Sequence, residues 1–142
     1  MIGNWKKKSG KSGLVSRLDK IFSKYIRLRD CMPNGMCKCI SCGKVKPLSQ
    51  IDAGHFWSRR HMNTRFDPMN VNGECRYCNS FDGDHLIGYR ENLIKKIGLS
   101  NFNYLQIKKE QTKKWEDFEI KALIKYYTQE VQRLSTLKGI KI

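Results

Sequence analysis

Two pairs of cysteines bracket the residues of this chain that could do chemistry. Each pair has the spacing Cys-x-x-Cys, and the four residues are Cys39, Cys42, Cys75 and Cys78. Such a pair forms a tight knuckle whose thiolates converge on one ion, and two knuckles together have the spacing of a tetrahedral zinc site. Four thiolates leave no open coordination position, so we expect this zinc to be structural. The segment between the pairs is longer than in a simple zinc ribbon and should carry further functional residues.

His55 lies between the two knuckles and is our candidate for a general base. Hydrolysis of a phosphodiester requires a base that activates water and a cation that offsets charge on the leaving oxygen. A lone histidine is more often structural. Here zinc would fix both ends of its loop, and a catalytic residue needs a rigid frame of that kind.

Two asparagines near the second knuckle have different expected roles. Asn79 directly follows Cys78, so zinc would fix its position, and its carboxamide oxygen suits Mg²⁺ or Mn²⁺. The alternative for Asn79 is an Asx-type cap on a following helix. We expect Asn70 to hydrogen-bond to the backbone and to hold the His55 loop in shape.

The charge of the chain favours nucleic acid as its partner. Its 28 Lys and Arg against 13 Asp and Glu give a net charge of +15, spread from Lys6 to Lys141. A field of this sign concentrates polyanions, although a ribosome-associated protein or a binder of anionic membranes would share it. Within the basic loop and just after it, Arg59, Arg60 and Arg65 are placed to clamp phosphates.

The chain has no apolar run that could span a bilayer and no signal-peptide pattern, so we expect a soluble, cytoplasmic protein. The cytosol keeps thiols reduced, so the two remaining cysteines, Cys31 and Cys37, should be free thiols without a role. Cys37 could instead compete as a zinc ligand, because it lies two residues before Cys39.

The elements that would position these residues form an α+β domain with a small core. We predict a flexible basic arm over residues 1–13, which touches phosphates or is simply solvated, and a single domain over 14–142. Its elements are a helix over 14–30, a zinc-bound core over 37–97 with a strand over 51–57 and a helix over 87–97, an irregular stretch over 100–114, and a C-terminal helix over 115–137. The apolar face of that last helix docks on the body or on a second subunit.

The order of these motifs resembles the lambda-type phage recombination proteins called NinG or Rap. The matching motifs are Asp52 to His55, Arg65-Phe66, Asn70, Cys75 to Asn79 and Tyr89-Arg90. The resemblance implies an HNH (ββα-metal) endonuclease that cuts branched DNA, including Holliday junctions and D-loops, and a phage- or prophage-encoded protein acting in a bacterial host. The Cys-x-x-Cys-Asn ending is also similar to the resolving endonuclease of T-even phages, whose corresponding residues bind zinc and the catalytic metal.

One position departs from the HNH pattern. Such nucleases place a metal-binding side chain directly before the base, where this chain has Gly54. Side chains alternate along a strand, so Asp52 would point to the same side, and we predict that Asp52 is the substitute ligand beside Asn79. His61 and His85 are alternatives, although we expect a surface or phosphate-contacting role for each.

Two other functions fit the same residues. A non-catalytic zinc ribbon that binds nucleic acid would explain the charge and the cysteines, and an HNH nuclease could instead cut linear DNA. Resolving a junction takes two cuts related by a near two-fold axis, so a homodimer would be natural.

Overall fold

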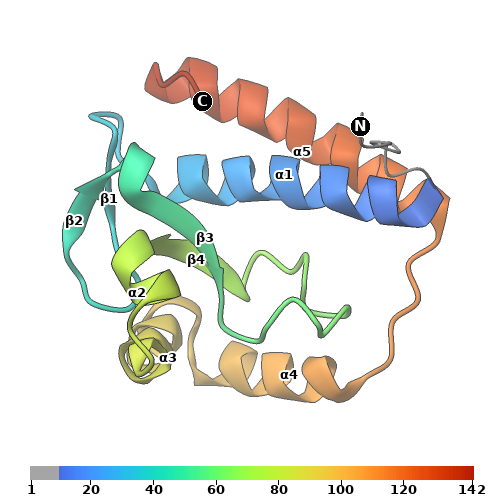
Figure 1. The fold of residues 1–142 in the computed structure, drawn as a ribbon, viewed down its shortest axis with the longest axis horizontal. Coiled ribbons are helices and arrows are strands. Elements are labelled where there is room, and N and C mark those ends of the chain that lie inside the picture. The colour runs from blue at the N-terminus through green and yellow to red at the C-terminus, as the bar shows by residue number, and fades with distance from the viewer. Residues whose placement is uncertain (1–9) are drawn as a thin grey trace, which may run out of the picture.

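The computed structural model describes residues 10–142 as a mixture of helices and short strands, which confirms the α+β class (Figure 1). The elements are, in order, α1 (Gly10–Asp30), β1 (Met36–Lys38), β2 (Val45–Pro47), the 3-10 helix η1 (Leu48–Gln50), β3 (Ile51–His55), β4 (Val71–Cys75), α2 (Arg76–Ser80), α3 (His85–Ile97), α4 (Leu99–Glu110) and α5 (Asp117–Lys138).

The strands form two antiparallel pairs, and these pairs carry the cysteines. β1 pairs with β2, and Cys39 and Cys42 lie in the turn between them. β3 pairs with β4 so that Ile51 is opposite Cys75. Cys75 therefore ends a strand while Cys78 lies in α2, directly after it.

α5 lies alongside α1 on one side of the β3–β4 pair (Figure 1). The two helices run parallel: the rings of Phe22 and Tyr127 are 5.0 Å apart, and further along Lys138 Nζ donates to the Leu28 carbonyl at 2.6 Å. The apolar face of the C-terminal helix thus packs onto its own chain. The buried residues of this core are Leu14, Leu18, Phe22, Ile26, Phe66, Val71, Ile120 and Tyr127.

The end of α1 holds both strands of the β3–β4 pair. Arg27 donates from Nε to the Ile51 carbonyl at 2.8 Å, and Arg29 donates from Nη2 to the Val71 carbonyl at 2.9 Å. Asp30 accepts a hydrogen bond from the Gly73 N–H at 2.8 Å. These side chains of α1 thus hold the backbone of both strands against the helix.

The stretch over 100–114 was predicted to be irregular, and that prediction was wrong. Residues Leu99–Glu110 form α4, which begins after Gly98, a residue with φ of +86°. Phe102 and Leu105 are one helical turn apart and pack on Phe56 in a second core, whose buried residues are Phe56, Tyr89, Leu93, Phe102 and Leu105. Two further apolar residues of this stretch, Tyr104 and Ile107, are exposed, so its apolar pattern concealed the helical period.

Other boundaries differ from the prediction by a few residues. α1 begins at Gly10, so residues 10–13 belong to a helix and not to the arm, and the rest of that arm lies outside the described residues. β3 ends at His55, and α3 begins at His85 and ends before Gly98 as predicted. α5 begins at Asp117, where Glu116 and Glu119 form a capping box. Within residues 10–142 no helix is both long and apolar enough to cross a membrane.

Cys31 and Cys37 were expected to be free thiols, but the structure joins them as a disulfide. A turn over residues 32–35 folds the chain back, and the two residues face each other in an isolated antiparallel bridge with their Cα atoms 4.3 Å apart. Cys37 is therefore committed to Cys31 and does not compete with Cys39 for a metal ion.

Candidate functional site

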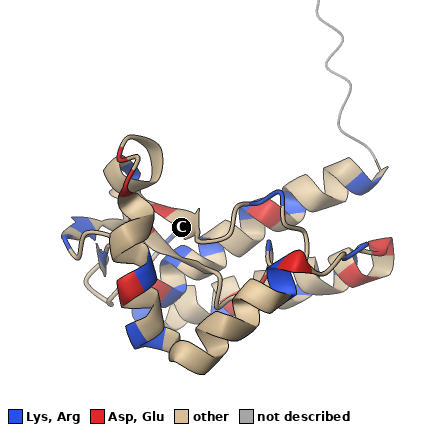
Figure 2. Cartoon of the chain, turned by 90° about the horizontal axis from the view of Figure 1, so that it is seen from below, with Lys and Arg blue, Asp and Glu red and all other residues tan. Residues whose placement is uncertain are grey.

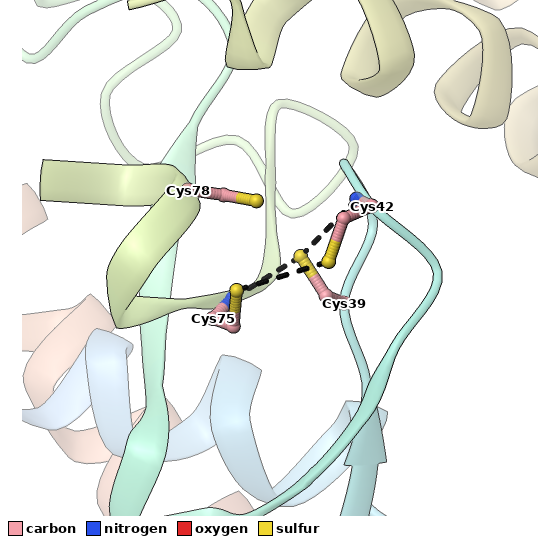
Figure 3. Close-up of side chains that lie close together, drawn as sticks. All are labelled: Cys39, Cys42, Cys75 and Cys78. Atoms are coloured by element: carbon pink, nitrogen blue, oxygen red, sulfur yellow. Dashed lines mark hydrogen bonds between the residues drawn. The ribbon is translucent and has the colours of Figure 1, made fainter. Parts of the chain in front are cut away.

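The four predicted zinc ligands converge on one point between the β1–β2 turn and α2 (Figure 3). Their sulfur atoms all lie within 4.8 Å of one another. Cys39 Sγ also accepts the Cys75 N–H at 3.2 Å, a hydrogen bond that favours a thiolate. Four sulfur donors around a common centre fit a zinc ion, and the cluster can hold one.

The thiols of this cluster differ in their acidity. Burial raises the pKa of Cys39 and of Cys78, since a buried charge without a counterion is unfavourable. Burial acts in the same direction on Cys42, but hydrogen bonds from the Lys44 N–H and from neighbouring thiols outweigh it and lower the pKa of Cys42. A zinc ion would offset the repulsion among four thiolates.

A cavity of about 570 Å³ lies beside this cluster, between α1, β3 and α2. Asp52, His55, Arg59 and Asn79, all predicted from the sequence as site residues, lie in its wall. Its lining residues are Asp19, Phe22, Ser23, Arg27, Asp52, Ala53, His55, Ser58, Arg59, Arg76, Asn79 and His85. Asp52 and Asn79 are in contact, with 3.2 Å between Oδ2 and Nδ2. Folding thus brings the carboxylate, the carboxamide and the imidazole into one cavity, although Asp52 and Asn79 are 27 positions apart in the sequence.

The hydrogen bond of His55 fixes which of its ring nitrogens can act as a base. Nε2 lies 2.9 Å from the carbonyl of Arg65. A carbonyl only accepts, so Nε2 carries the proton and Nδ1 keeps its lone pair. Burial lowers the pKa of His55, the charge of Arg59 adds to this, and the bond to the Arg65 carbonyl opposes it. The imidazole is therefore neutral at pH 7, as a base must be.

Asn70 is fully buried and makes the backbone hydrogen bonds that we expected of it. Its amide donates to the carbonyls of Trp57 and Thr64, both at 3.0 Å, and its oxygen accepts the Trp57 N–H at 2.9 Å. One side chain thereby closes the loop between β3 and β4. This loop carries Arg65, whose carbonyl orients His55.

The three predicted phosphate-binding arginines have different surroundings. Arg59 lines the cavity, and Arg60 is exposed next to it. Arg65 points instead toward α1, where it forms an ion pair with Asp19 and donates from Nε to that carboxylate at 3.0 Å. Its guanidinium also lies over the Phe66 ring, 5.6 Å from the centroid. Its charge is thus already neutralised within the chain.

The two other histidines lie in different places relative to the cavity. His85 lines the cavity, at the start of α3, whereas His61 lies in the loop outside it. Sequence reasoning overlooked Arg76, which lies 3.4 Å from Asp52, and Glu74, which is fully buried in β4. A signal for Glu74 was available: β4 carries polar side chains at alternate positions directly before Cys75, where a buried strand would normally be apolar.

A family model described as "NinG: Bacteriophage Lambda NinG protein" matches residues 4–136. This chain belongs to the NinG family. It is 30% identical over 122 residues to protein ninG of Salmonella phage P22, and 29% identical over 122 residues to that of Escherichia phage lambda. Each alignment covers 84% of this chain but only 57% and 56% of those proteins, so the chain spans little more than half the length of these NinG relatives. No solved structure matches it.

Proposed function

We propose that this NinG-family chain is a metal-dependent, structure-specific DNA endonuclease that hydrolyses phosphodiesters in branched recombination intermediates. The observation that carries the proposal is the cavity itself. It holds a neutral histidine with a free ring nitrogen, a contacting Asp52–Asn79 pair and the arginine Arg59. The order of β3, β4 and α2, with the base on the first strand, agrees with a ββα-metal nuclease.

Asp52 and Asn79 would hold the divalent cation. A carboxylate and a carboxamide side by side on a cavity wall offer the oxygen ligands that Mg²⁺ and Mn²⁺ prefer. When bound, such a cation supplies positive charge near the scissile phosphate and the departing 3′ oxygen. Zinc on the four cysteines would have no open position and would serve the fold alone.

His55 performs the proton transfer in this mechanism. Its Nδ1 takes a proton from water as the water oxygen bonds to phosphorus and the bond to the 3′ oxygen breaks. The Arg65 carbonyl keeps the imidazole in the required tautomer, which gives Arg65 a positioning role. Arg59 and Arg60 bind neighbouring phosphates, since both are exposed and Arg59 lines the cavity.

Exposed aromatic residues support a branched substrate. Tyr77 and Phe81 are 67% and 75% exposed on and just after α2, with ring centroids 6.4 Å apart. They lie near Arg76 and Asn79, which line the cavity. Unpaired or unstacked bases, which occur at branch points, stack on aromatic rings of this kind. Lys and Arg lie on every α-helix from α1 to α5 and on β1 and β2, which suits a large polyanionic substrate (Figure 2).

The proposal is tested with purified protein and its His55→Ala variant, in Mg²⁺ or Mn²⁺, on a synthetic four-way junction and a matched linear duplex. We expect the wild type to cut the junction and the variant to bind it without cutting. The Tyr77→Ala, Phe81→Ala double variant should lose its preference for the junction while it keeps residual cutting.

Two outcomes would replace the proposal. Equal cutting of both substrates would keep the HNH chemistry and remove the junction specificity. Tight binding without any cutting would leave a zinc-ribbon protein that binds nucleic acid, and Asp52 and Asn79 would lose their proposed roles.

Junction cleavage also calls for two active sites, and we propose a homodimer on the junction.

A further inference from the structure

Glu74 occupies the space where a side chain at position 54 would stand. A Cβ at that position would lie 2.9 Å from Glu74 Cβ and 3.1 Å from its Cδ, with the carboxylate oxygen Oε1 closer still. Both residues lie on the same face of the β3–β4 pair, and only glycine leaves room for this carboxylate. The ligand that HNH enzymes place at position 54 and the Glu74 side chain are therefore mutually exclusive.

The Glu74 carboxylate is buried and only half satisfied. It is 0% exposed, and its Oε2 accepts hydrogen bonds from the Ser41 hydroxyl and, at 2.6 Å, from His85 Nδ1. Oε1 has no partner among the residues that the structure describes. A buried carboxylate with a bare oxygen is costly, so this arrangement calls for positive charge nearby.

His85 is the member of this cluster that reaches the cavity. Its Nδ1 donates to Glu74, so Nε2 is the ring nitrogen left to bind a ligand in the cavity. The side chain lines the same cavity as Asp52 and Asn79. A histidine whose other nitrogen donates to a carboxylate is the arrangement that orients most metal-binding histidines in proteins.

We infer that His85 completes the divalent-cation site as a third protein ligand through Nε2, and that Glu74 is the positioning residue that orients it. This rests on the proposed function, because it concerns the cation that Asp52 and Asn79 would hold. A histidine ligand also indicates which metal ion the site prefers. Imidazole is a good ligand for transition metals and a poor one for Mg²⁺, so the site should favour Mn²⁺ over Mg²⁺.

The test is pulsed EPR of the zinc-containing protein with Mn²⁺ added, which detects ¹⁴N nuclei coordinated to the ion. We expect nitrogen modulation in the wild type, its loss in His85→Ala, and its retention in His55→Ala, the matched variant of the other cavity histidine. Glu74→Ala and Gly54→Ala should weaken Mn²⁺ binding by about tenfold to a hundredfold, as loss of an orienting partner does elsewhere. Glu74→Gln keeps an acceptor for Nδ1 and should bind better than Glu74→Ala.

Glu74 precedes a zinc ligand, so each variant is first checked for its zinc content and its circular dichroism spectrum. Mn²⁺ binding without nitrogen modulation, or modulation lost in His55→Ala and kept in His85→Ala, would overturn the inference and leave the proposed nuclease intact. Absence of any Mn²⁺ binding beyond the zinc site would overturn both. Normal zinc content with a Mn²⁺ affinity unchanged by His85→Ala would also contradict it.

Discussion

His55 and Asn70 show how single side chains in this chain are fixed by backbone groups. The imidazole is held by the Arg65 carbonyl, and Asn70 bonds to three backbone groups of the same loop. A backbone partner sets position and tautomer together, because it cannot rotate away as a side chain can. Two predictions belong to this scale.

The first concerns the pH dependence of cleavage. Burial lowers the pKa of His55 from its ordinary 6.5, and a general base acts only in its neutral form. We expect the single-turnover rate to rise with pH through a midpoint below 6.5 and to level off above it, when measured between roughly pH 5 and 8 at saturating metal. A midpoint above 6.5 would contradict this role for His55.

The second concerns the loop that Asn70 closes. Asn70→Ala leaves the Trp57 N–H and two carbonyls without partners, which should reduce the free energy of unfolding by about 2 kcal/mol or more. Chemical denaturation measures this loss, and the exposed Asn103→Ala on α4 serves as the control. Equal stability of the two variants would show that the loop does not depend on Asn70.

Several of the helices and strands that form the site are short segments that would not be stable on their own. β3 and β4 have five residues each and α2 has five, which is too short for stability in isolation. The cysteine cluster joins α2 to the β1–β2 turn, and the end of α1 holds the strands. α1 therefore contacts both ends of the β3–β4 pair, at Ile51 and at Val71, and the cysteine cluster lies at the end where Ile51 pairs with Cys75.

Zinc removal should disassemble this part of the molecule. Structural zinc contributes about 10 kcal/mol or more of folding free energy, which is comparable to the whole stability of a domain. We expect a strong chelator, or the substitution Cys75→Ser, to abolish the cooperative thermal unfolding transition. Circular dichroism would monitor unfolding, and mass spectrometry would measure the zinc content. The Cys31→Ser, Cys37→Ser double variant breaks the disulfide but keeps all four ligands, so it should retain zinc. A cooperative transition in the zinc-free protein would refute the prediction.

Over the whole molecule, basic residues outnumber acidic ones. The net charge of +15 is distributed along the chain, and acidic residues such as Asp19 and Asp30 are tied up in ion pairs with arginine. Nucleic acid binding should therefore be strongly dependent on salt. The alignments leave more than two fifths of the P22 and lambda ninG proteins uncovered.

The corresponding prediction is a steep salt dependence of junction affinity. If about six phosphates are neutralised, the slope of log K against log salt should be about −5. Arg59→Ala should reduce that slope by about one, because Arg59 is exposed at the cavity. Arg65→Ala should leave the slope unchanged, since Asp19 already neutralises its charge, and should instead lower stability. Identical slope changes in the two variants would assign Arg65 to the phosphate contacts.

Local patterns in the sequence predicted which chemical groups the site contains. Cysteine spacing predicted the four-cysteine cluster, the motif order predicted the family, and Asp52, His55 and Asn79 were predicted as site residues, which all line one cavity. These signals are local: a knuckle needs only two residues between its ligands, and a helix needs only an apolar period. The apolar spacing did not predict α4, because exposed apolar residues of this helix obscure the helical period of its buried ones.

Contacts between residues far apart in the sequence depend on how the whole chain packs. The pairing of Arg65 with Asp19 joins residues 46 positions apart, and the Glu74–His85 contact depends on the register of β3 against β4 and on the start of α3. The Cys31–Cys37 bridge depends on how one turn folds back. Sequence spacing specifies which groups lie close along the chain. A buried carboxylate or guanidinium needs a polar partner, and the packing of the chain determines which residue is near enough to be that partner.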